Sequence, residues 1–196
     1  TDEAKREIRF WNSFMLTSSL AKTLKTKSKV PKTSSKRRYA TKSTVKDDVF
    51  FHTPNGKATT DSVFTNKKVI VVGVPGAFTQ VCTSAHVPGY AKNASAFKAQ
   101  GIDDVVIVAV NDHHVMKAWA EKMDVVDKVS MLADPDGSFT RLVGHEMDLS
   151  VAGLGKRSTR YAMLVDNGKV VREFVEQSPA DLKVSSADEM LKALKA

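Results

Sequence analysis

Runs of apolar, β-branched residues indicate where the buried strands of this chain lie. The longest run, residues 69–74, is closed by Pro75-Gly76, a pattern typical of a strand buried on both faces. Residues 105–110 form a second run of this kind. Between the runs, apolar residues at helical spacing predict a helix that ends at Gly101, with a kink at Pro88-Gly89. We therefore expect a right-handed strand-helix-strand unit with parallel strands.

Turn and cap signals predict the remaining elements. Asparagine-glycine pairs at 55–56 and 167–168 indicate two hairpins. These hairpins join residues 49–52 to 57–60 and residues 161–165 to 169–174. We also expect a helical turn at 61–64, a helix capped by residues 111–112, a strand at 129–132, a short helix around Phe139 and Leu142, and a final helix opened by a capping box at 186–189.

The positive charge of the chain is concentrated near its N-terminal end. The 196 residues carry a formal net charge of +8. Residues 1–39 hold 11 lysines and arginines and three acids, which leaves 19 basic and 19 acidic residues for 40–196. Since the second part has no basic excess, we expect no nucleic-acid partner. No apolar run approaches the ~18 residues of a membrane-spanning helix, so we expect no membrane association.

Residues 15–39 have the composition of an organellar transit peptide. They contain eight basic residues, no acid and nine serines and threonines. Leu16, Leu20 and Leu24 recur at the spacing of a short amphipathic helix. We expect residues 1–39 to be a disordered leader and residues 40–196 to be the folded domain.

The end of this leader indicates a destination. Arg37-Arg38-Tyr39 resembles a mitochondrial processing site, so we expect cleavage after Tyr39 and a location in the mitochondrial matrix. Initiation at Met15 would remove every acid from the leader. A basic tail that only aids solubility, a plastid presequence and a cytoplasmic location are the alternatives.

Cys82 is the only cysteine in the chain, which excludes an intramolecular disulfide and a multi-cysteine zinc site. The five histidines lack the spacing of metal ligands, so we expect no metal or cofactor. Thr83 and Ser84 can cap a helix, and Cys82 would then lie at or just before a helix N-terminus. Unpaired N–H groups and the macrodipole favour a thiolate there.

A helix terminus is not sufficient to make a thiolate the main species. At neutral pH this takes about 3–4 kcal/mol of preferential stabilisation, of which a helix N-terminus contributes at most about 2 kcal/mol. A nearby cation is therefore required. An isolated cysteine is most often a buried inert thiol, so its neighbours decide between the two interpretations.

The spacing of Pro75, Thr79 and Cys82 resembles the Pro-X-X-X-Thr-X-X-Cys motif of the peroxiredoxins. Together with residues 86–90, it is similar to the peroxiredoxin 5 (type II) subfamily, here as a one-cysteine variant. Gln80 stands where that subfamily usually has proline, at a free position of the motif. The resemblance extends over about residues 47–194, with further motifs at 110–112, 116–119, 132–137 and 157–162.

The resemblance implies an α/β, thioredoxin-like fold with a central mixed β-sheet flanked by helices. It implies that Cys82 is the nucleophile, that Arg160 is the missing cation, and that Arg160 and the Thr79 hydroxyl bind the peroxide. Pro75 would shield the thiolate from water. These groups would stabilise the charge that moves onto the leaving oxygen.

The implied activity is that of a thiol peroxidase. Attack on hydrogen peroxide or an alkyl hydroperoxide would leave a sulfenic acid on Cys82. With no second cysteine in this chain, an external thiol must complete the cycle, either glutathione with glutaredoxin or a thioredoxin. The resemblance also suggests a homodimer. A peroxide sensor or redox relay with little turnover, and a structural protein without thiol chemistry, are the competing hypotheses.

Four residues near these motifs have an open interpretation. Arg157 can be a second partner of the site, and His86 can be either a structural histidine or a group at the edge of the site. Trp119 and Phe78 are expected to pack in the core or in an interface rather than contact substrate.

Overall fold

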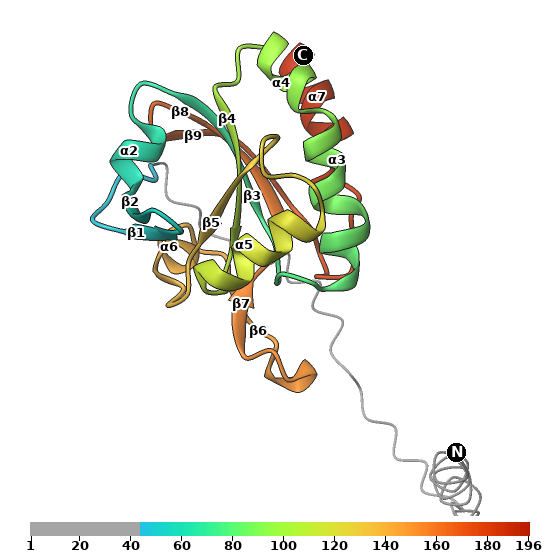
Figure 1. The fold of residues 1–196 in the computed structure, drawn as a ribbon. Helices are drawn as coiled ribbons and strands as arrows, with labels where there is room; N and C mark the ends of the chain where they lie inside the picture. Colours follow the sequence, from blue (N-terminus) through green and yellow to red (C-terminus); the bar gives the residue numbers. More distant parts are fainter. Residues whose placement is uncertain (1–43) are drawn as a thin grey trace, which may run out of the picture. The chain divides into compact units, whose positions relative to one another are not determined.

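One mixed seven-stranded sheet lies at the centre of residues 44–196, the residues described by this computed structural model (Figure 1). The strand order is β2-β1-β5-β4-β3-β8-β9. Strands β3, β4 and β5 run parallel, and β8 runs antiparallel to both β3 and β9. These strands are β3 (Lys68–Gly73), β4 (Asp104–Ala109), β5 (Ser130–Ala133), β8 (Tyr161–Asp166) and β9 (Lys169–Val175). The expected parallel unit and the expected mixed sheet are confirmed.

The two faces of the sheet are covered by different helices because alternate residues of a strand point to opposite sides. Ile70 and Val72 belong to a core with α3, α4, α5 and α7, whereas Val69 and Val71 belong to a core with α2 and α6. The helices are α2 (Thr60–Phe64), α3 (Val87–Lys92), α4 (Ala94–Ala99), α5 (His113–Lys122), α6 (Ser138–Leu142) and α7 (Ala187–Lys195). Cys82 lies on the side of α3 and α5.

The first hairpin is present, but its turn differs from the prediction. Strand β1 (Phe50–Thr53) pairs with β2 (Gly56–Thr59), and Thr53 is opposite Gly56. The two loop residues are therefore Pro54 and Asn55. Gly56 begins the return strand with φ +117°, a conformation that favours glycine.

The predicted second hairpin turn and the predicted caps of α5 and α7 agree with the structure. Asn167 and Gly168 have φ values of +46° and +77° and join β8 to β9, as a tight hairpin turn requires. Asp112 accepts a hydrogen bond from the Val115 N–H at 2.9 Å and caps α5. Ser186 accepts one from the Glu189 N–H at 3.3 Å and caps α7.

A second, two-stranded sheet was not predicted. It pairs β6 (Glu146–Asp148) with β7 (Lys156–Ser158), joined through the short 3₁₀-helix η2 (Ser150–Ala152). Figure 1 shows this hairpin extending away from the main sheet. Its strands have three residues each and no apolar run, so periodicity gives no signal for them.

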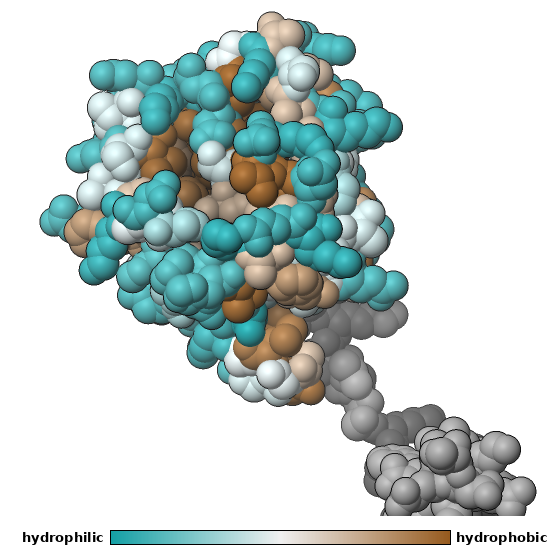
Figure 2. Space-filling view, in the orientation of Figure 1, coloured by the Kyte–Doolittle hydropathy of each residue, from teal (hydrophilic) through white to brown (hydrophobic). Residues whose placement is uncertain are grey.

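Hydrophilic side chains cover most of the face shown in Figure 2, with apolar side chains gathered between them. Among residues 44–196, the exposed large apolar side chains belong to separate segments; they are Phe50, Phe78, Val126, Val151, Val171 and Val184. Within residues 44–196, no helix has the length and apolar character needed to cross a membrane. The leader, the cut after Tyr39 and the start at Met15 concern residues outside the described part.

Candidate active site

The loop after β3 carries the predicted motif and is fastened at several points. The Val74 N–H donates to the Val108 carbonyl at 3.0 Å, so pairing with β4 continues one residue beyond β3. Pro75 and Gly76 are buried. The Ala77 N–H donates to Asn111 Oδ1 at 3.0 Å, which ties the loop to the segment after β4.

Cys82 lies in the first turn of a helix that begins earlier than predicted. Gln80 and Val81 are already helical, and the Thr83 N–H donates to the Thr79 carbonyl at 3.0 Å. The predicted cap at Thr83 and Ser84 is therefore wrong. Because the Thr79 carbonyl accepts the first helical bond, the N-terminus lies three residues before Cys82. The Thr79 hydroxyl donates to the Gly76 carbonyl at 2.9 Å.

The helix is widened just after Cys82. Residues Cys82–His86 form a π-helix, η1, in which the Val87 N–H reaches back five residues to the Cys82 carbonyl. Pro88 has no N–H to donate to the Ser84 carbonyl, which removes one α-helical bond at this point. The π-helix thus lies just before Pro88-Gly89, where the sequence predicts a kink, and a second break at Asn93 separates α3 from α4.

Arg160 approaches Cys82 because β3 and β8 are neighbours. Gly73 is opposite Tyr161 in the sheet, so the residue before β8 lies beside the loop after β3. The side chain of Arg160 is buried, with 2% of the residue exposed, and its Nη1 donates to Cys82 Sγ at 3.4 Å. Cys82 is itself fully buried. The sequence-predicted cation and cysteine are therefore in contact although 78 residues separate them.

His86 lies inside this site and contacts Arg160. Its Nε2 is 3.0 Å from the Ser185 carbonyl, which can only accept, so Nε2 carries the proton. The unprotonated Nδ1 then accepts from Arg160 Nη1 at 3.0 Å. Burial, together with the positive charge of Arg160, lowers the pKa of His86 to about 3. His86 is therefore a neutral acceptor that helps to direct the guanidinium.

A backbone carbonyl holds the other edge of the guanidinium. The Pro179 carbonyl accepts from Arg160 Nε at 3.2 Å and from Nη2 at 2.7 Å. Sequence reasoning missed this contact, because a carbonyl is present at every residue and leaves no side-chain signal. Only the path of the chain after β9 brings Pro179 to the site.

Arg157 lies beside the loop rather than at the sulfur. Its Nη1 donates to Asn111 Oδ1 at 3.2 Å and its Nε donates to the Leu154 carbonyl at 2.8 Å. A Cβ on Gly76 would lie 2.9 Å from Arg157 Nη1, so glycine permits this close approach. Arg157 therefore supports the motif loop through Asn111.

The two aromatic residues near the motif differ in exposure. Trp119 is fully buried, and its Nε1 donates to the Thr83 hydroxyl at 3.1 Å, so core packing is confirmed for this residue. Phe78 is 53% exposed, with φ +60° and its ring centroid 6.3 Å from that of Trp119. Phe78 is not a core residue, and its place in an interface stays a prediction.

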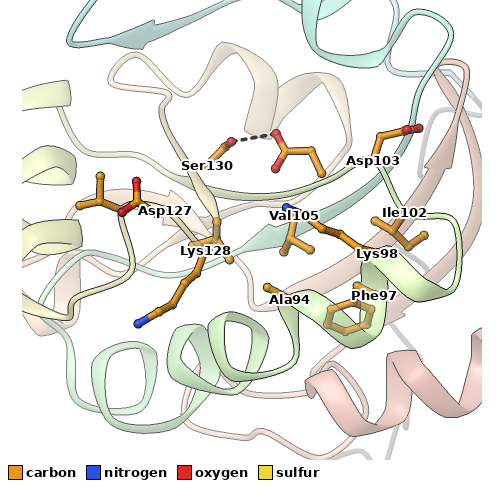
Figure 3. Close-up of a pocket in the computed structure, with 12 residues that line it drawn as sticks. Ala94, Phe97, Lys98, Ile102, Asp103, Val105, Asp127, Lys128 and Ser130 are labelled. Atoms are coloured by element: carbon orange, nitrogen blue, oxygen red, sulfur yellow. Dashed lines mark hydrogen bonds between the residues drawn. The ribbon is translucent and has the colours of Figure 1, made fainter.

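The cavity drawn in Figure 3 is lined by none of these groups. It has a volume of about 160 Å³ and lies between α4 and the segments that begin β4 and β5. Cys82 follows the opposite end of the parallel strands. Ser130 Oγ in the cavity wall donates to Asp104 at 2.7 Å. Within residues 44–196, no group of three or more histidine, cysteine or acidic side chains is arranged to hold a metal ion.

Comparison with known proteins gives a consistent set of relatives. The family model for redoxin matches residues 25–191. Mitochondrial peroxiredoxin-2F of Oryza sativa subsp. japonica is 46% identical over 129 residues, which cover 66% of this chain and 65% of that protein. The match thus spans just under two thirds of that relative.

Two solved structures are similar over most of their length. The structure of reduced Prx3 in complex with H2O2 from Vibrio vulnificus has a TM-score of 0.74 and 41% identity, covering 80% of this chain and 96% of that one. Peroxiredoxin 5 from Alvinella pompejana has a TM-score of 0.68 and 33% identity, covering 76% and 94%.

Proposed function

This chain belongs to the redoxin family and, within it, to the type II (peroxiredoxin 5-like) peroxiredoxins, and we propose that the whole protein is a thiol-dependent peroxidase acting through Cys82. The observation that carries the proposal is the buried contact between Arg160 Nη1 and Cys82 Sγ at 3.4 Å. The guanidinium of Arg160 bonds to Cys82, to the neutral His86 and to the Pro179 carbonyl, so its positive charge lies against the only cysteine of the chain and supports an activated thiolate rather than an inert thiol.

The reaction begins with attack by the Cys82 thiolate on one oxygen of the peroxide. The S–O bond forms as the O–O bond breaks, and the leaving oxygen takes a proton and departs as water or alcohol. The sulfur is oxidised to a sulfenic acid and the peroxide is reduced. Hydrogen peroxide and alkyl hydroperoxides are the proposed substrates, and the peroxide in the Vibrio vulnificus complex supports the first of them.

Arg160 is placed to stabilise negative charge first on the Cys82 thiolate and then on the leaving oxygen of the peroxide. A guanidinium has five N–H donors, and four of them are engaged by Cys82, His86 and Pro179. The remaining N–H, on Nη2, is available for a peroxide oxygen. Since the guanidinium is already fixed, little reorganisation accompanies the movement of charge onto the leaving oxygen.

Thr79 and Pro75 complete the proposed site. The Thr79 hydroxyl uses its proton on the Gly76 carbonyl, which leaves its oxygen lone pairs free to accept the proton of the hydroperoxide. Rotation of the hydroxyl would let it donate to the leaving oxygen instead. Pro75 is buried at the start of the loop and excludes water from the thiolate.

An external thiol completes the catalytic cycle. The thiol displaces water from the sulfenic acid and forms a mixed disulfide with Cys82, and a second thiol then releases the Cys82 thiol and leaves as a disulfide. We propose glutathione with glutaredoxin, or a thioredoxin, as this reductant. Cys82 is the only cysteine of the chain, which supports an external source.

We also propose a location and an assembly. The composition of residues 15–39 and the mitochondrial name of the rice relative support the mitochondrial matrix, and the family supports a homodimer. Protein from isolated mitochondria that begins at residue 40 would support the leader. Protein that retains Met15 would contradict it.

A peroxide sensor or relay is the second candidate. It is favoured by the complete burial of Cys82, which leaves no surface for a bulky thiol in this conformation. Consumption of peroxide in the presence of NADPH, glutathione reductase, glutathione and glutaredoxin, or of the thioredoxin system, separates the two. Continuous turnover supports the peroxidase, whereas one equivalent of peroxide consumed per chain supports the sensor.

A further inference from the structure

A buried carboxylate lies behind the candidate site, where no sequence motif indicates one. Glu176 directly follows β9 and is 4% exposed. Its Oε1 accepts from the backbone N–H groups of Lys183, Val184 and Ser185 at 2.7–2.8 Å. It also accepts from the Ser185 hydroxyl at 2.9 Å. One oxygen therefore gathers four donors and closes the loop of residues 177–185.

The loop that Glu176 closes contacts Arg160 by two separate routes. On one route, the Pro179 carbonyl within the loop accepts from both Nε and Nη2 of Arg160. On the other, the Ser185 carbonyl at the end of the loop accepts from His86 Nε2 and from the Tyr90 hydroxyl at 2.9 Å. His86 Nδ1 in turn accepts a hydrogen bond from Arg160 Nη1. Both edges of the guanidinium are thus set by the conformation of one loop.

The backbone of Arg160 depends on the same residue. The Glu176 N–H donates to the Arg160 carbonyl at 2.9 Å, which extends the pairing of β8 and β9 to the site. Burial acts to raise the pKa of Glu176, but the hydrogen bonds from Ser185, Val184 and Lys183 outweigh it and the pKa is lowered. The carboxylate therefore stays charged at neutral pH and remains a strong acceptor.

We propose that Glu176 is a positioning residue of this site: its carboxylate holds residues 177–185 in the conformation that directs Arg160 at Cys82. The inference rests on the proposed function for its importance in peroxide reduction, but the geometry concerns the reactivity of Cys82 itself. Loss of the carboxylate loosens both the Pro179 contact and the Ser185–His86 contact. Arg160 then spends less time against the sulfur, and Cys82 becomes less reactive.

The test compares the full chain with Glu176→Gln and Asp181→Asn. Asp181 is a matched control because it lies in the same loop, carries the same charge, and its carboxylate pairs with the exposed ammonium of Lys183 at 3.0 Å. The first readout is the rate of Cys82 alkylation by iodoacetamide from about pH 5 to about pH 9, which does not require peroxidase activity. The second is the rate constant for reaction with hydrogen peroxide.

Glu176→Gln is expected to move the midpoint of the alkylation profile up by about one pH unit and to slow the peroxide reaction roughly tenfold. Asp181→Asn is expected to leave the midpoint of the alkylation profile at its wild-type pH and to change the rate constant for peroxide by less than about twofold. If Glu176→Gln does not fold, Ser185→Ala, which removes only one donor to Glu176, is expected to shift the profile in the same direction by a smaller amount. A folded Glu176→Gln, or failing it Ser185→Ala, with the wild-type alkylation profile would overturn the proposal. If wild-type protein fails to reduce peroxide while Glu176→Gln still shifts the alkylation profile, the proposed peroxidase activity is wrong and the positioning role of Glu176 stands.

Discussion

Arg160 is distinguished by how its donors are divided among three partners. One edge of the guanidinium binds the Pro179 carbonyl, and Nη1 divides its two N–H groups between His86 and the sulfur. A planar group with fixed donor directions meets all of these acceptors at once. A lysine ammonium is a single point of charge and cannot do so.

Arg160→Lys tests this geometry. The variant keeps the positive charge but loses the fork, so we expect the rate constant for hydrogen peroxide to fall by about 100-fold or more. Stopped-flow measurement with the reduced protein gives this rate directly. Arg172→Lys, at an exposed position of β9, is the matched control and should react like wild type. A rate for Arg160→Lys within about threefold of wild type would show that charge alone suffices.

His86 gives the fold a dependence on pH. The folded protein keeps His86 neutral down to its pKa of about 3, whereas in the unfolded chain it takes up a proton near its ordinary pKa of 6.5. The unfolded state binds the extra proton between these two values. The free energy of unfolding therefore decreases as the pH falls below about 6.5, by up to about 1.4 kcal/mol per pH unit from this residue.

His86→Gln removes that titration and is expected to flatten the decline. Urea unfolding between about pH 4 and pH 7 measures the slope for each protein. His114→Gln, at an exposed position, controls for loss of a histidine. Equal slopes for wild type and His86→Gln would contradict the neutral, buried state of His86.

At this scale the sequence identified the side chains of the proposed site but not the groups that hold them in place. The motif groups Pro75, Thr79 and Cys82 in one short stretch after β3, and the resemblance singles out Arg160. Glu176 and the two carbonyls that it positions lie outside any motif, because their role depends on how the loop after β9 folds back. A lone glutamate after a strand would ordinarily be assigned to the surface.

At the scale of elements, the register between β3 and β8 brings the two halves of the site together. Gly73 is opposite Tyr161, and a Cβ at Gly73 would lie 2.0 Å from the Tyr161 ring. The absence of a side chain there lets Tyr161 cross the strand. Arg160 is held in place one residue before that contact.

Gly73→Ala is expected to destabilise the protein by at least about 1–3 kcal/mol, since the Tyr161 ring has to move within a packed core. The free energy of unfolding in urea measures the loss. Gly89→Ala, in α3, is the control, because its Cβ would meet nothing closer than 3.7 Å and alanine favours a helix. Unchanged stability of Gly73→Ala would show that the ring can move without cost.

The elements that the sequence predicted are those with a strong local signal. Apolar runs predicted β3 and β4, and an asparagine-glycine pair predicted the turn between β8 and β9. The helix start at Gln80 was missed because Thr83 and Ser84 are residue types that commonly cap helices. Here the helix instead begins with the bond from the Thr83 N–H to the Thr79 carbonyl, while the Thr79 hydroxyl bonds to the Gly76 carbonyl. The hairpin of β6 and β7 was missed because three-residue strands have no measurable period.

For the whole molecule, the thioredoxin-like fold brings segments that are distant in the sequence together around the single cysteine. The parallel strands and the antiparallel hairpin converge so that a loop after β3, the start of β8 and the loop after β9 meet at Cys82. Residues 40–196 hold equal numbers of basic and acidic residues, so this part of the chain has no excess of positive charge. The positive charge of the chain belongs to the proposed leader.

The most direct test of the account is the steady-state consumption of hydrogen peroxide by the full chain, with glutathione and glutaredoxin or with thioredoxin as reductant. We expect many turnovers per chain, and none above background for Cys82→Ser, which conserves the shape of the side chain but lacks the thiolate. Turnover that persists in Cys82→Ser, or wild-type protein that stops after one equivalent with every reductant, would contradict a peroxidase centred on Cys82.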